Sequence, residues 1–151
     1  MTRIVAIWPW LVFLLAIGFL TPSLVNLAAE IAGGRSVGRA FQDIISRQFA
    51  EGHNLFWLAL ITLIPFLLLG SILLVTPVSY SSARVACIAI GGLLGILILL
   101  LPVHWQVWAP LFSSDKNSAS TSVIGLLVVP FACIVPMLVG SLIGRLVSRT
   151  W

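Results

Sequence analysis

The chain has 151 residues, of which 60% are hydrophobic and 8% are charged, and its mean hydropathy is +1.18. Soluble domains carry about 25% charged residues, so this composition excludes one and indicates a single membrane domain over residues 1–151. The formal charge of +4 comes from basic residues that are scattered along the chain. Because nucleic-acid binding needs a basic stripe on one face, we expect no nucleic-acid partner.

Four apolar blocks contain no Lys, Arg, Asp, Glu or His: Ile4–Leu20, Leu55–Val75, Val85–Leu101 and Val123–Gly144. A helix needs about 20 apolar residues to cross a bilayer. The pattern therefore predicts an all-α, polytopic transmembrane four-helix bundle with spans at about 4–20, 54–75, 84–101 and 122–146. Blocks without ionisable residues argue against a proton-coupled transporter, a voltage sensor or an intramembrane acid–base enzyme.

The first block has the position of a signal peptide, but the sequence after it is a poor match to a cleavage site, so we expect a retained span. Pro22 is expected to kink or end this helix, with Asn26 and Glu30 near the headgroups. Gly33 and Gly34 then break the helix.

Residues 36–50 alternate between apolar and polar with helical spacing. One side gathers Val37, Ala40, Phe41, Ile44, Ile45, Gln48 and Phe49, and the other gathers Arg39, Gln42, Asp43, Ser46 and Arg47. We predict one amphipathic interfacial helix between the first and second spans, at the membrane surface or against the bundle. Its candidate partner-binding residues are Phe41, Ile44, Ile45 and Arg47, although a simple connector would show the same pattern.

Pro102 is expected to stop the third helix, which leaves a loop over Val103–Thr121. Since His53 opens the second helix and His104 follows the third, both histidines should lie on one side of the membrane. With Trp57 and Trp105 they form a candidate rim site for a quinone, a haem or a metal. Interfacial His and Trp without a ligand are the commoner case, so we expect no cofactor and no metal, and rings that are well apart and face interface or solvent.

Small residues recur four apart in the last two spans, at Gly91 and Gly95 and at Gly140 and Gly144. Such positions let helix backbones approach closely in lipid. We expect them to join the third and fourth helices within one bundle, with contacts between subunits as the alternative.

Four spans put both termini on one side of the membrane. That side would hold Arg3, Arg84, Arg145 and Arg149, and the other would hold Arg35, Arg39, Arg47 and Lys116 with all four acidic residues. The two sides hold equal numbers of Lys and Arg residues, but Arg84 and Arg145 stand directly at helix ends. We therefore expect cytoplasmic termini in a plasma or bacterial inner membrane.

These observations favour a non-enzymatic accessory, assembly or partner-binding subunit of a membrane complex. Its partners would be the lipid bilayer and either another membrane protein or further copies of the chain. Two alternatives stay open: an enzyme or electron-transfer subunit with a ligand at the extracytoplasmic rim, and a pore or carrier formed by oligomerisation.

Overall fold

The computed structural model describes residues 2–49, 54–77, 79–112 and 119–149, and every regular element in these ranges is a helix. The helices are α1 (Thr2–Ala32), α2 (Val37–Arg47), α3 (Leu55–Val75), α4 (Ser82–Phe112), α5 (Ala119–Ala132) and α6 (Ile134–Val147). Four stretches are long and apolar enough to cross a membrane: Ile7–Ala32, Leu55–Val75, Ser82–Phe112 and Ile124–Val147. The protein is therefore all-α, with four helices suited to span a bilayer.

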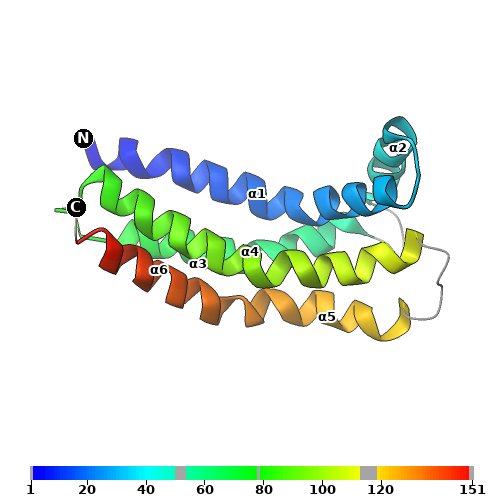
Figure 1. Cartoon of the computed structure of the whole chain (residues 1–151). Coiled ribbons are helices and arrows are strands. Elements are labelled where there is room, and N and C mark those ends of the chain that lie inside the picture. Colours follow the sequence, from blue (N-terminus) through cyan, green and yellow to red (C-terminus); the bar gives the residue numbers. More distant parts are fainter. Residues whose placement is uncertain (1, 50–53, 78, 113–118, 150–151) are drawn as a thin grey trace.

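The long helices lie side by side and run in alternating directions (Figure 1). α1 begins and α6 ends at the same end of the bundle, where α3 also turns into α4. The short helix α2 lies at the opposite end and runs across the direction of the long helices. The number of candidate spans is therefore even, and α2 lies at the end opposite the two termini.

Two helices extend beyond the ends expected from the sequence. α1 continues through Pro22 to Ala32, and α4 continues through Pro102 to Phe112. The expected loop from Val103 is therefore helical as far as Phe112. A proline removes one hydrogen bond, but opening the backbone in apolar surroundings would leave several groups unpaired, so the helix persists.

The fourth span is divided in two. α5 ends at Ala132 and α6 begins at Ile134, with Cys133 between them. Pro136 explains the break, because it has no N–H to donate to the carbonyl four residues earlier and its ring crowds that turn. The amide of Cys133 still donates to Val129 and the carbonyl of Cys133 accepts from Met137, so the two helices stay nearly continuous.

α4 is the central helix of the bundle and contacts α1, α3, α5 and α6. Its contact with α6 depends on the four glycines. A methyl group on Gly91 would collide with the carbonyl oxygen of Gly140, one on Gly95 with that of Pro136, and one on Gly144 with that of Cys87. Backbone therefore packs on backbone along this seam, which lies within a single chain.

The seam predicts an asymmetry among Gly→Ala variants. Because the obstructing atoms in Gly91→Ala and Gly140→Ala are backbone atoms, the helices must separate, at a cost of about 1–3 kcal/mol. Gly125→Ala is the control, since its nearest neighbour is Val103 Cγ1 at 3.7 Å and the helix gains up to about 1 kcal/mol in propensity. Reversible unfolding in mixed micelles measures these differences, and equal stability of all three variants would contradict the seam.

Candidate functional site

The end of α1 is shaped by two glycines. Gly34 has φ of 90°, and its amide donates to Ile31 while the amide of Arg35 donates back to Glu30. This is the Schellman arrangement, in which a glycine in the left-handed region closes a helix. Gly33 lies so close to α4 that an added Cβ would be 2.7 Å from the carbonyl oxygen of Phe112. The chain therefore turns sharply and returns Arg35 to the last turn of α1.

The carboxylate of Glu30 is fully buried and is paired with two arginines. Arg35 Nη1 lies 3.2 Å from Glu30 Oε2, and Arg47 Nη1 lies 3.2 Å from Glu30 Oε1. A buried charge is costly unless it is paired and hydrogen-bonded on its free oxygens, and here each oxygen has its own cation. Because Arg47 belongs to α2, these ion pairs attach α2 to the bundle.

Two further contacts complete this ion-pair network of Glu30, Arg35, Asp43 and Arg47. Asp43 accepts from Arg35 and lies 3.8 Å from Arg47 Nη2, the spacing expected for residues four apart on α2. The guanidinium carbons of Arg35 and Arg47 lie 5.3 and 5.6 Å from the ring centroid of Phe112, within cation–π range. The ends of α1, α2 and α4 thus meet at one charged cluster.

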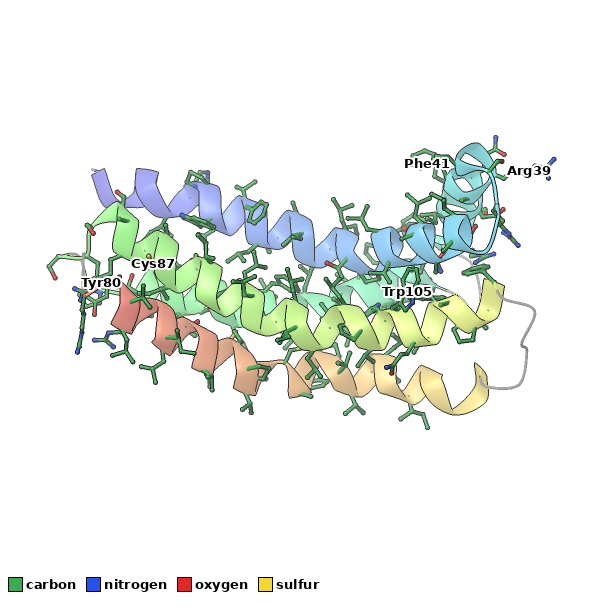
Figure 2. The ribbon with its side chains drawn as sticks, viewed as in Figure 1. Arg39, Phe41, Tyr80, Cys87 and Trp105 are labelled. Atoms are coloured by element: carbon green, nitrogen blue, oxygen red, sulfur yellow. The ribbon has the colours of Figure 1, made fainter. Side chains whose placement is uncertain are left out.

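α2 buries only one narrow side against the bundle. Ala40 is 0% exposed and Ile44 is 8% exposed, whereas Phe41 and Ile45 are 56% and 61% exposed. Figure 2 shows Phe41 on the side of α2 that faces back over α1, with Arg39 pointing away from the bundle. Of Phe41, Ile44 and Ile45, the three large apolar residues proposed for partner binding, Ile44 alone is buried against the protein, next to Ala40. Placement of Phe41 and Ile45 in the headgroup zone stays a prediction.

Three buried polar side chains lie behind the ion-pair network without hydrogen-bond partners among the described residues. They are Asn26 on α1, and His104 and Trp108 on α4. On α1, Glu30 follows Asn26 by four residues, and on α4, Trp108 follows His104 by four residues. Each pair therefore lies on one face of its helix. Buried polar atoms are rarely left unpaired, so these side chains are candidates for binding a water or a ligand group.

The depth of these groups follows from α3. Its 21 residues rise about 32 Å, close to the roughly 30 Å of a hydrocarbon core, so Leu55 marks one edge of that core. Leu55 packs in the same buried cluster as Ala29 and Trp108. Glu30 therefore lies near the edge, and His104 lies about one turn, roughly 6 Å, further inside.

Of the candidate rim site, His53 lies outside the described residues, and His104, Trp57 and Trp105 lie within them. His104 is 0% exposed, which contradicts the expectation that its ring faces interface or solvent. Trp105, the next residue, lines an apolar cavity of about 420 Å³ between α1 and α4, and Trp57 is 63% exposed. Because α4 continues past Pro102, His104 turns into the core while Trp105 faces outward. A shared ligand of both histidines stays a prediction.

An open polar cavity of about 650 Å³ adjoins the ion-pair network on its outer side. Its lining comes from the turn after α1 and from α2: Gly34, Arg35, Ser36, Arg39, Gln42 and Asp43. The cavity carries more positive than negative charge and is open to solvent. Ser36 occupies the N-cap position of α2, but its side chain makes no capping hydrogen bond.

Sequence reasoning missed Glu30, Asn26 and Trp108 as buried site residues. It placed Asn26 and Glu30 near the headgroups and did not predict that the protein buries them. The sequence did contain a signal for Asn26 and Glu30. These two polar residues are four apart, so they lie on one face of a helix that continues beyond Pro22. Nothing local indicates that Arg47, 17 residues away, neutralises Glu30.

In comparisons with known proteins, no family model, no curated protein and no solved structure matches the chain.

The ion-pair network predicts an order of stability losses. Replacing both Arg35 and Arg47 by Gln strands a buried carboxylate and should cost about 3–5 kcal/mol. Glu30→Gln leaves two arginines that can reach water, so about 1–3 kcal/mol is expected. Asp43→Asn removes a partly exposed partner and should cost at most about 1 kcal/mol. Denaturant unfolding in micelles measures the order, and a loss in Asp43→Asn that equals the double variant would refute it.

Proposed function

We propose that the protein is a non-enzymatic accessory subunit of a membrane complex and that it binds a partner membrane protein through α2. The observation that carries this proposal is a helix that is fixed in place but incompletely covered. Ion pairs from Arg35 and Arg47 hold α2 to Glu30, while its large apolar side chains stay exposed.

Exposed apolar side chains recur every fourth residue along α2 and just after it, and we call them the α2 patch: Val37, Phe41, Ile45 and Phe49, which are 56–72% exposed. Contiguous exposed apolar side chains rimmed by polar ones are typical of interaction sites, and an amphipathic helix is a common docking element. A helix that is already ordered loses little conformational entropy on binding. The α2 patch therefore suits a partner at the membrane surface, either a different protein or a second copy of the chain.

A second candidate function is a ligand-binding subunit at the same end of the bundle. The observation that favours it is His104, whose two ring nitrogens are buried without partners among the described residues. An imidazole in this state can bind a haem or metal, or donate to a quinone carbonyl. An absorption band in the visible spectrum of the purified protein would favour a haem over the accessory role.

The proposal includes cytoplasmic termini in a plasma or bacterial inner membrane. Arg84 and Arg145 stand at helix ends on the side of the termini, and cytoplasmic ends of spans are enriched in such residues. The α2 patch then faces the extracytoplasmic side.

A photo-crosslinking residue at Phe41 or Ile45 should give one discrete protein adduct in native membranes. The matched control is Gln42, which is exposed on the same helix. Replacing Phe41 and Ile45 together by Asp should weaken association at least tenfold, because burying each side chain contributes about 1.5–3 kcal/mol. Gln42→Asp with Ser46→Asp is the control pair. Adducts with lipid alone would contradict a protein partner.

Orientation is tested with single cysteines after Cys87 and Cys133 are replaced by Ala. Ser36 and Ser81 are exposed at opposite ends of the bundle and serve as labelling sites. A membrane-impermeant maleimide should label Ser36→Cys in intact cells and Ser81→Cys only after permeabilisation. The reverse result would show that the termini are outside.

A further inference from the structure

α2 is held to the rest of the protein by few apolar contacts. It packs mainly on α1, and among its own residues Ala40 and Ile44 are the buried ones. Just after its C-terminal end, the carbonyl oxygen of Gln48 accepts a hydrogen bond from the amide of Phe56, 3.0 Å away. Before its N-terminal end, the chain turns through Gly34, and no atom lies within 4 Å of where a Cβ on Gly34 would be. The position of α2 therefore depends largely on the ion-pair network.

The charge of Glu30 decides what the removal of α2 costs. The carboxylate is 0% exposed, and one of its oxygens is paired with Arg47 of α2. While Glu30 is charged, a departing α2 would leave that oxygen buried without its cation, and an unpaired buried charge is costly. When Glu30 is neutral, no charge is stranded. Arg47, whose side chain is 27% exposed, can then move into water together with Asp43 on the same helix.

The charged groups around Glu30 come from the turn after α1 and from α2: Arg35, Asp43 and Arg47. α4 contributes the ring of Phe112, over which both guanidinium groups lie, and His104 about one turn further inside. Arg35 also joins α2 through Asp43, but that carboxylate is 39% exposed, so water screens the pair and it holds α2 weakly. Glu30 is therefore the acidic group on which the attachment of α2 mainly depends.

We propose that α2 is a latch, a releasable helix that leaves the bundle when the Glu30 carboxylate takes up a proton from solvent. With Glu30 charged, α2 is docked and presents the α2 patch in one orientation. Protonation removes the ion pairs, and α2 moves away about the turn at Gly34. α2 is thus docked at higher pH and released as the pH falls. This regulation rests on the proposed function, because acid on the α2 side of the membrane then also releases the partner.

The distance between two nitroxide labels, on Gln42→Cys of α2 and Ser71→Cys of α3, tests the release in lipid bilayers. Both sites are exposed, and the native cysteines are first replaced by Ala. Acidification from about pH 7 to about pH 4, the range in which carboxylates titrate, should add a second and broader distance population. Glu30→Gln should show this population already at neutral pH, enriched at least about tenfold over the unaltered chain, and should not respond to pH.

Two controls separate release from other effects of acid. Labels on Ser71→Cys and Gly125→Cys both lie in the long helices, and Gly125 has room for a side chain, so their distance should stay constant while the bundle is intact. Asp43→Asn should keep the response to acid, because Glu30 is unaltered. Unchanged distances in Glu30→Gln, or loss of the acid response in Asp43→Asn, would overturn the proposal.

The photo-adduct at Phe41 measures the partner separately. Its yield should fall in Glu30→Gln in proportion to the docked fraction of α2. An adduct that persists although α2 is released would overturn the regulation of partner binding. If the unaltered chain forms no protein adduct, the proposed function is contradicted, while the distances between the nitroxide labels still decide whether α2 is a latch.

Discussion

The bundle depends on how closely two helices can approach without a hydrophobic driving force between them. Lipid tails are as apolar as the leucines on these helices, so burial alone does not bring the spans together. Glycines at positions 91, 95, 140 and 144 let the backbones of α4 and α6 touch, and dispersion forces act at short range. α4 then serves as the surface on which α1 and α3 also pack. Close packing at one seam thus fixes the central helix for the whole protein.

The two ends of the bundle differ in how they handle charge. At the α2 end, Glu30 is neutralised inside the protein, and the arginines that do so also hold α2 in place. At the other end, Arg84 and Arg145 have no described carboxylate near them and rest on Tyr80. One end therefore pairs its charges within the protein, while the arginines at the other end have no carboxylate partner among the described residues.

Hydropathy was sufficient to predict the four spans, because the bilayer imposes the same length and composition on any helix that crosses it. The ends of α1 and α4 were not predictable by the same argument. Pro22 and Pro102 end helices in water, where a freed carbonyl binds solvent, but not where neighbouring helices exclude water. His104 was expected at the rim because Pro102 was expected to end its helix. The helix continues, and His104 lies inside the bundle. The role of Glu30 was hidden because its partner Arg47 is distant in sequence.

The unequal lengths of the helices couple this protein to the thickness of its membrane. The apolar stretch Ile7–Ala32 rises about 39 Å, whereas α3 rises about 32 Å and packs against it. Helices packed together cannot tilt independently, so a bilayer matched to α3 leaves the last turn of α1 among the headgroups. There the two arginines border water, while the Glu30 carboxylate that they pair with is buried in the protein. A thicker bilayer would draw that turn into hydrocarbon, and hydrophobic mismatch of this kind sorts proteins among membranes.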